Sequence, residues 1–288
     1  MPVPRPGSVR RALTAPASVL ATVLALLAGF LATVLALSGT ASAATPQPLS
    51  HPDDDWAGSQ ILRHEGAGDR TRGAAEPSLL AGVEGVDVSS HQGNVDWAAL
   101  WNSGVRFAYA KATEGTTYTN PYFPQQYNGS YNVGMVRGAY HFALPDVSSG
   151  ATQANYFLSH GGGWSRDGKT LPGALDIEYN PYGATCYGLS QSAMVSWLKD
   201  FVNTYASRTG RDPVIYTSTS WWKTCTGNNA SFGGLNPLWI PRYGSSVGEL
   251  PAGWGFHTIW QYTSTGPTVG DHDLFNGSYD RLVALANG

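Results

Sequence analysis

Seven short apolar runs rich in β-forming residues follow one another after Ala81. They are GVDVSS, VRFAYAKAT, MVRGAYHFA, GALDIEY, PVIYTS, LWIPRYG and TIWQYTS. Strands that alternate with helix-length intervals predict a parallel, barrel-like α/β fold. The last three runs leave too few residues for full helices between them, so we expect an irregular barrel that is helical early and strand-rich late. No repeat of about 20–50 residues is present, which argues against a solenoid.

The clearest helix in the pattern runs from Ser190 to about Ser207. Its apolar residues recur at helical spacing and form one stripe, which predicts packing against a sheet. Ser190 is the expected N-cap and Gly210 the expected stop, and a second, shorter helix is expected before the glycine run at residues 161–163. The stripe consists of Met194, Trp197, Leu198, Phe201, Val202 and Tyr205.

The first 43 residues have the order of a secretory signal peptide. Three arginines precede an apolar stretch of 19 residues, Val19 to Leu37, and the triplet Ala41-Ser42-Ala43 follows it. The stretch is near the length of a membrane span, so an uncleaved anchor is the alternative. Because a small-residue cleavage site follows the stretch, we expect cleavage after Ala43 and a secreted, extracellular protein without stable membrane association.

Residues 44–81 are polar and show no sustained period, so we interpret them as an extension or linker before a folded domain at residues 82–288. His51 together with Asp53, Asp54 and Asp55 could form a metal cluster. Charge runs in such segments are usually solvated, however, and we expect no metal there.

Charge and cysteine content narrow the class of protein. Cleavage after Ala43 leaves 14 basic and 20 acidic residues, a formal charge of −6, which argues against nucleic acid as a partner. The remaining 245 residues suit a globular exported enzyme or binding protein. Cys186 and Cys225 are the only cysteines, and we expect them to form one disulfide rather than a metal or thiol site.

Asp176 and Glu178 lie two residues apart in LPGALDIEYNP, on a predicted strand. Alternate side chains of a strand share a face, so both carboxylates are expected in one cleft and Ile177 on the other side. Glycoside hydrolysis needs such a pair, one group protonated and one ionised. Ion pairing or loop capping is the alternative, but the flanking apolar residues place the pair at the carboxyl end of a buried strand, where barrel enzymes carry their chemistry.

Further acids occupy equivalent strand ends. Asp87 lies in GVDVSSHQ and Glu114 in YAKATEG, while Asp271 and Asp273 follow the last clear strand. Together with Asp176 and Glu178 they predict an acidic rim on the barrel.

Aromatic and histidine side chains accompany these acids. Rings in or beside the predicted strands can stack on sugars or pack in the core; they are Tyr140, Trp239, Trp260 and Tyr262. His141 and His91 could serve as bases, although a lone histidine beside a strand is more often a hydrogen-bonded structural group.

Taken together, these segments resemble the family 25 glycoside hydrolases, the lysozymes of Chalaropsis type, across essentially all of residues 82–288. The similar blocks, in order, are GVDVSSHQGNVDW, FAYAKATEGTTYTNPYF, GAYHFA, ALDIEYN, IYTSTSWW, LWIPRYG and WQYTSTG. The resemblance implies a modified, flattened TIM-like barrel with about five helices and eight strands. It also implies hydrolysis of the bond between N-acetylmuramic acid and N-acetylglucosamine in peptidoglycan glycan strands. We expect a monomer that needs no metal or organic cofactor.

The resemblance also implies roles for individual residues. Glu178 corresponds to the catalytic acid and Asp176 to its partner, which steadies positive charge directly or by orienting the 2-acetamido group of the substrate. The resemblance also makes Asp87 and Glu114 acids of the catalytic cleft, Asp273 a supporting acid and Tyr140 a ring near the reacting sugar. We expect Asp273 and Tyr140 to bind substrate, together with Trp260 and Tyr262, which are chosen on their place in the strand pattern alone.

Some features depart from the family pattern or leave the reaction open. Ala110 replaces a larger aliphatic residue, the DHDLF stretch offers Asp271 as an alternative to Asp273, and the extension has no counterpart. We expect retention of anomeric configuration. A peptidoglycan-binding protein without catalysis and an enzyme that cuts chitin-like polymers are the alternative functions.

Overall fold

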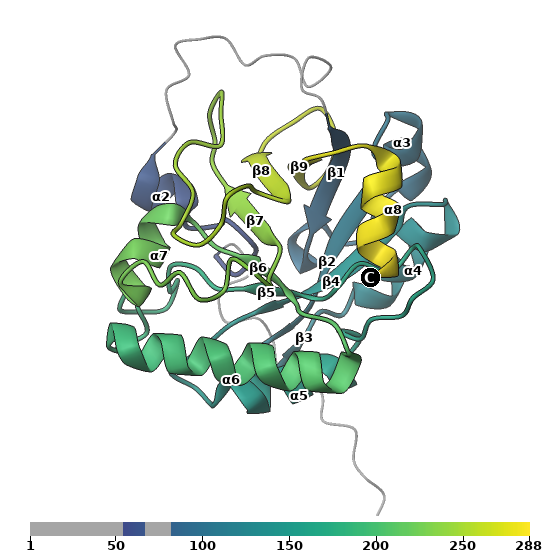
Figure 1. Ribbon diagram of the computed structural model, residues 1–288. Coiled ribbons are helices and arrows are strands. Elements are labelled where there is room, and N and C mark those ends of the chain that lie inside the picture. Colours follow the sequence, from purple (N-terminus) through teal and green to yellow (C-terminus); the bar gives the residue numbers. More distant parts are fainter. Residues whose placement is uncertain (1–53, 67–81) are drawn as a thin grey trace, which may run out of the picture. The chain divides into compact units, whose positions relative to one another are not determined.

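A closed ring of eight strands forms the centre of the computed structural model, which describes residues 54–66 and 82–288 (Figure 1). The order around the ring is β1-β9-β8-β7-β6-β5-β4-β2, and β1 pairs with β2 to close it. A short ninth strand, β3 (Tyr118–Thr119), pairs with the end of β2. The ring strands are β1 (Val83–Val88), β2 (Phe107–Glu114), β4 (Val136–Phe142), β5 (Ala174–Asp176), β6 (Val214–Tyr216), β7 (Leu238–Pro241), β8 (Ile259–Thr263) and β9 (Asp271–Phe275). The expected eight-stranded α/β barrel is therefore confirmed.

Strand direction gives this barrel one functional end. Strands β1, β2, β4, β5, β6, β7 and β8 run parallel to one another, and β9 alone is antiparallel to both its neighbours, β8 and β1. The carboxyl ends of seven strands and the amino end of β9 therefore meet at one end, which we call the rim. No helix lies between β7, β8 and β9, in agreement with the strand-rich end expected from sequence.

Seven α-helices occur in the described part of the chain, two more than the approximate number expected. Several are too short to show a reliable helical period, and α2 lies in a segment that lacks a pattern altogether. The helices are α2 (Ile61–Glu65), α3 (Trp97–Asn102), α4 (Phe123–Asn132), α5 (Gly150–Ser159), α6 (Gln191–Thr209), α7 (Thr219–Thr226) and α8 (Tyr279–Asn287). None of them is long and apolar enough to cross a membrane.

Helix α6 confirms the clearest expectation from the sequence. The Ser190 hydroxyl accepts a hydrogen bond from the Ala193 amide, and Gly210 ends the helix in the left-handed conformation. All six residues of the predicted stripe are buried. They pack with outward residues of the barrel wall, among them Leu175 and Ile177, and with α5, which lies beside α6 in Figure 1.

The interior of the barrel is filled at the end opposite the rim. Inward side chains at the starts of several strands, such as Phe107 and Val214, form one cluster with Leu282 and Ala286 of α8. Helix α8 therefore closes this end, and the open chemistry of the fold is confined to the rim.

The two cysteines form the expected disulfide. Cys186, in the segment after β5, is bonded to Cys225 of α7. The predicted signal peptide at residues 1–43 lies outside the described residues.

Residues 54–66 do not behave as a solvated linker. The expectation that the aspartate run is solvated is wrong for Asp55, whose side chain is 1% exposed, because it pairs with the buried ammonium of Lys111 at 3.5 Å. Ala57, Gly58 and Ile61 are buried as well. This part of the extension therefore packs against the barrel.

Candidate active site

Asp176 and Glu178 face the barrel interior at the rim. Strand β5 ends at Asp176, and Glu178 follows directly beyond it. Ala174 packs in the interior cluster, whereas Leu175 and Ile177 pack in the outer cluster under the helices. The alternation of a strand therefore turns Asp176 and Glu178 inward, as the sequence predicts.

Burial changes the acid–base properties of this pair. Burial raises the pKa of Glu178 to about 8, while a hydrogen bond from the Gly58 amide opposes the increase. Burial, and next the charge of Glu178, raise the pKa of Asp176 well above its ordinary value. Within the described residues, both oxygens of Asp176 and Oε2 of Glu178 lack a hydrogen-bond partner. Two such carboxyls can hold one proton for delivery to a ligand.

Gln261 connects the acids on the opposite side of the rim. Its Nε2 donates to Oδ2 of Asp87 at 2.8 Å and to Oδ2 of Asp271 at 3.3 Å. Its Oε1 accepts from the hydroxyls of Tyr216 at 2.8 Å and Tyr243 at 3.0 Å. Sequence reasoning missed Gln261 and both tyrosines; the period of two in the β8 run, which turns Gln261 to the face opposite Trp260 and Tyr262, was the available signal.

Both aspartates of β9 point inward, because they are two residues apart on a strand. Asp271 pairs in register with Asp87 at the rim, and Asp273 pairs with Gly85, one step deeper. Burial raises the pKa of Asp271 well above its ordinary value, and the charges of Asp87 and Glu178 add to the increase. Asp273 instead accepts a hydrogen bond from Trp239 Nε1 at 2.7 Å. Asp271 therefore interacts electrostatically with Glu178, whereas Asp273 lies deeper and holds Trp239.

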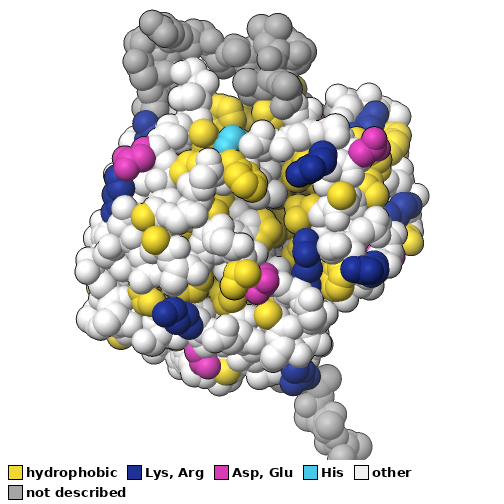
Figure 2. Space-filling model, viewed as in Figure 1, with side chains coloured by type: hydrophobic (Ala, Val, Ile, Leu, Met, Phe, Trp, Pro, Cys, Tyr) yellow, Lys and Arg dark blue, Asp and Glu magenta, His cyan; other side chains and the backbone are white. Residues whose placement is uncertain are grey.

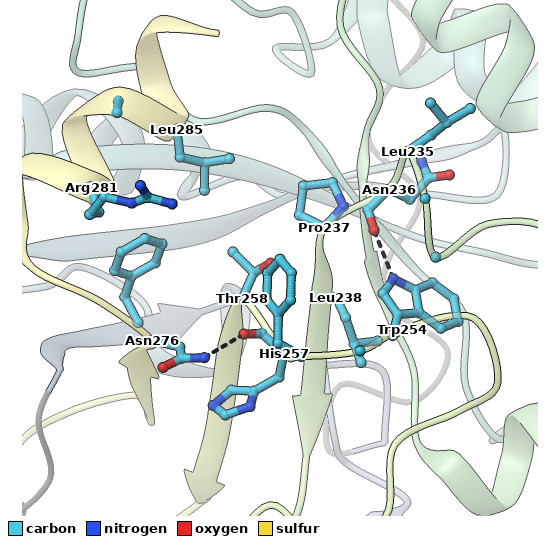
Figure 3. A pocket seen from close by; sticks show the side chains of 16 residues that line it. Leu235, Asn236, Pro237, Leu238, Trp254, His257, Thr258, Asn276, Arg281 and Leu285 are labelled. Atoms are coloured by element: carbon cyan, nitrogen blue, oxygen red, sulfur yellow. Dashed lines mark hydrogen bonds between the residues drawn. The ribbon is translucent and has the colours of Figure 1, made fainter.

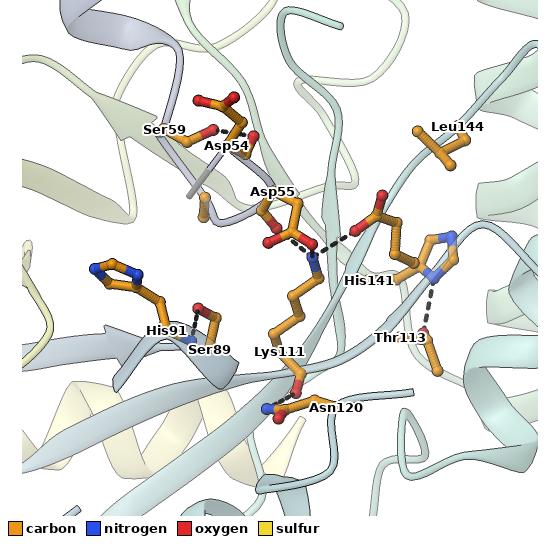
Figure 4. Close-up of polar contacts among 12 residues, drawn as sticks. Asp54, Asp55, Ser59, Ser89, His91, Lys111, Thr113, Asn120, His141 and Leu144 are labelled. Atoms are coloured by element: carbon orange, nitrogen blue, oxygen red, sulfur yellow. Dashed lines mark hydrogen bonds and ion pairs between the residues drawn. The ribbon is translucent and has the colours of Figure 1, made fainter. Parts of the chain in front are cut away.

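Glu114 belongs to an ion-pair network at the same rim. Its carboxylate lies 2.6 Å from Nζ of Lys111 and accepts a hydrogen bond from the Tyr182 hydroxyl at 2.5 Å. Figure 4 shows the Lys111 side chain extending to Asp55 of the extension. Lys111 is thus a buried cation among many carboxyls, and sequence reasoning did not single it out.

The expected aromatic residues divide between the two faces of the wall. Tyr140 is fully buried inside the barrel, and its ring meets Trp239 edge-on at 6.3 Å between centroids. Trp260 and Tyr262 point the other way: Trp260 Nε1 donates to the Arg242 carbonyl at 2.8 Å, and the Tyr262 hydroxyl donates to Glu84. The structure does not bring Trp260 and Tyr262 to the carboxylates, because Gln261 between them takes the inward position.

His141 has the structural role that the sequence favours. Thr113 Oγ1 lies 2.8 Å from its Nδ1 (Figure 4), and Gln153 Oε1 lies 2.9 Å from its Nε2. Burial lowers the pKa of His141 to about 4. His91 lies just beyond the end of β1, with its ring 6.2 Å from that of Trp56.

Pockets distinguish the two ends of the barrel. One of about 390 Å³ adjoins the rim and is lined by Asp271, His91 and Trp56. Another of about 460 Å³ lies where Leu238 begins β7 and Phe275 ends β9, and no acidic residue lines it (Figure 3). On the molecular face in Figure 2, acidic side chains are few and scattered, while the rim acids are buried. The rim is therefore the candidate active site.

Comparison with known proteins gives consistent matches. The profile of Glycosyl hydrolases family 25 matches residues 86–271. Lysozyme M1 of Streptomyces globisporus is 47% identical over 277 residues, 91% of this chain and 93% of that protein. A match of this length reaches into residues 44–81, so the expectation that the extension has no counterpart is wrong. The N,O-diacetylmuramidase of Chalaropsis sp is 48% identical over 210 residues, 72% of this chain and 100% of that protein. The solved structure of a muramidase from Acremonium alcalophilum is 61% identical, with a TM-score of 0.71, and covers 72% of this chain and 99% of that chain.

Proposed function

Because this chain belongs to glycosyl hydrolase family 25, we propose that it is a secreted muramidase that cuts the bond between N-acetylmuramic acid and N-acetylglucosamine in bacterial peptidoglycan. The chain is a glycoside hydrolase, and two similar proteins are named as lysozyme and N,O-diacetylmuramidase. The observation that carries the proposal is the inward-facing pair Asp176 and Glu178 at the rim, with its raised pKa values.

In the proposed reaction, Glu178 is the general acid. Its raised pKa keeps a large fraction of the carboxyl protonated near neutral pH, ready to protonate the glycosidic oxygen as the bond to C1 breaks. Asp176 stabilises the positive charge that develops at C1, either directly or by orienting the 2-acetamido group to attack C1. Water then adds to C1, and its proton returns to Glu178. Such substrate assistance retains the anomeric configuration.

The remaining rim residues hold the substrate and tune the pair. Gln261 fixes Asp87 and Asp271 by hydrogen bonds, and these acids face the reacting sugar in our proposal. Tyr140 lines the interior beside them, and Asp273 holds Trp239 from below. We leave Trp260 and Tyr262 out of the proposed site because they pack on the other face of β8.

The domain organisation is part of the proposal. Cleavage after Ala43 would release a monomer whose catalytic domain spans residues 82–288. N-terminal sequencing of the exported protein, combined with light scattering, tests both the cleavage and the monomeric state.

A matched pair of variants tests the reaction. The exported protein is incubated for an extended time with purified peptidoglycan, and new reducing ends are identified after borohydride reduction. Wild type is expected to yield reduced muramic acid and Glu178→Gln none, since an amide cannot supply the proton. Glu249→Gln, the same change at an exposed carboxylate that pairs with Lys223, should retain wild-type activity. Reduced glucosamine instead of muramic acid would contradict the proposed bond, and proton NMR of the first product tests retention.

A further inference from the structure

Residues 54–66, which we call the segment, enter the rim, where residues 55–60 lie against the proposed catalytic residues. The Gly58 amide donates to Oε1 of Glu178 at 2.6 Å. The Asp55 carbonyl accepts from Nζ of Lys111, and the Ala57 amide lies 3.4 Å from the Tyr140 hydroxyl. Ala57 packs in the interior cluster of the barrel. The segment therefore enters the active site with its backbone.

One peptide group of this segment has the polar pattern of a substrate. The carbonyl of Ala57 accepts from Gln261 Nε2 at 2.9 Å, and the N–H of the same peptide bond, on Gly58, donates to Glu178. An N-acetyl group on a sugar offers the same arrangement, one carbonyl acceptor and one N–H donor on a planar amide. The Ala57–Gly58 peptide thus occupies the polar groups that an acetamido sugar would use.

Helix α2, which forms the second half of the segment, packs outside the rim. Ile61 is buried in the outer cluster, and the His64 ring stacks on Tyr179 with 4.1 Å between centroids. The Tyr179 hydroxyl donates to Glu65 at 3.0 Å. Helix α2 is thus attached to Tyr179, the residue that directly follows Glu178, and the segment is held outside the rim as well as within it.

A glycan polymer cannot reach the carboxylates while this segment is in place. Asp176 and Glu178 are 1% and 0% exposed. The Acremonium alcalophilum muramidase matches 72% of this chain over 99% of its own length, the share that residues 82–288 make up here. Every strand of the closed ring lies within residues 82–288, so the role of the segment in this chain is not to complete the barrel.

We propose that residues 54–66 are an intramolecular inhibitor, which occupies the active site as a substrate mimic and has to leave before glycan binds. The inference rests on the proposed function only in naming acetamido glycan as the competing ligand. It predicts a latent enzyme whose activity is released by loss or displacement of the segment.

Two glycines in the segment provide a matched test in the full-length exported protein. Gly58 has φ +89°, and a Cβ there would collide with Oη of Tyr243 and Oε1 of Gln261. Gly66 also has positive φ, +69°, but a Cβ there meets nothing within 4 Å. Gly58→Ala should expel the segment, whereas Gly66→Ala introduces similar backbone strain without the collision. Ile61→Ala, which removes buried contacts of the segment with the outer cluster, is a second, milder opening variant.

Two readouts separate this inference from the proposed function. One is the initial rate of reducing-end release from peptidoglycan; the other is carbodiimide labelling of Glu178, quantified by peptide mass spectrometry, which needs no turnover. We expect Gly58→Ala to raise both by about tenfold or more, Ile61→Ala to raise both less, and Gly66→Ala to match wild type.

Each other outcome has a defined meaning. Equal rates and equal labelling in wild type and Gly58→Ala would overturn the inhibitor, whether or not peptidoglycan is cut. Labelling that rises in Gly58→Ala without release of reducing ends would support the inhibitor and overturn the muramidase. Circular dichroism of Gly58→Ala checks that the barrel is folded.

Discussion

Gln261 donates its side-chain amide to Asp87 at 2.8 Å across the interior of the barrel, whereas its neighbour Tyr262 points to the outer face and bonds Glu84. The two residues are adjacent on β8 and lie on opposite faces of it. Removal of the Gln261 amide leaves the buried carboxyls of Asp87 and Asp271 without their shared donor. The two carboxyls are then no longer held in one orientation toward the substrate.

This contrast predicts different effects for adjacent substitutions. Gln261→Leu should lower kcat for peptidoglycan by about 10²-fold, the size of effect expected for a misplaced catalytic group. Tyr262→Phe, which removes only a hydroxyl on the opposite face, should leave kcat unchanged. Both are measured in a Gly58→Ala background, so that the segment does not limit the rate. Equal losses in the two variants would show that both faces of β8 contribute to the site.

Periodic patterns made the barrel and the carboxylate pair predictable. Helix α6 has a six-residue apolar stripe, and the Asp176–Glu178 spacing defines a face without knowledge of any neighbour. Non-local contacts were not predictable in this way. Nothing in the local sequence of Asp55 indicates that Lys111, 56 residues away, is its partner, or that the backbone of Gly58 reaches Glu178.

The disulfide is expected to stabilise the domain. Cys186 and Cys225 close a loop of 39 residues, and loss of that constraint on the unfolded chain costs about 4 kcal/mol. The double variant Cys186→Ser/Cys225→Ser should therefore unfold at lower denaturant concentration. Urea unfolding of the variant and of reduced wild type should give the same midpoint; a variant with the midpoint of oxidised wild type would contradict this prediction.

His141 should matter for stability and not for the chemical step. Burial lowers its pKa to about 4, below the ordinary 6.5, so the unfolded chain binds a proton that the folded chain does not. The contribution of neutral His141 to the free energy of unfolding is therefore complete above pH 6.5 and is lost as the pH falls toward 4. His141→Gln should lose about 1–3 kcal/mol at pH 7 by breaking bonds to Thr113 and Gln153, yet keep its kcat. Exposed His160→Gln is the control for urea unfolding at pH 7 and 5.

Docking of the inhibitory segment should depend on pH through Asp55. Burial raises the pKa of Asp55 to about 6 against an ordinary 3.8, even though the charge of Lys111 lowers it, and Glu114 adds to the increase. The docked segment thus binds a proton more tightly than the free segment does. The contribution of protonated Asp55 to docking is complete below pH 3.8 and is lost as the pH rises through 6. The other ionisable groups whose charge interacts with Asp55 are the hydroxyls of Tyr118, Tyr140 and Tyr182.

Hydrogen exchange at the Gly58 amide measures this dependence directly, because that amide is bonded to Glu178 only in the docked state. After correction for intrinsic exchange, its protection in wild type should fall between pH 4 and 6. Asp55→Asn cannot titrate, so its protection should change less over the same interval. Protection that rises with pH in wild type would mean that the ion pair with Lys111 outweighs the desolvation of Asp55. A fall in pH, rather than a rise, would then release the enzyme.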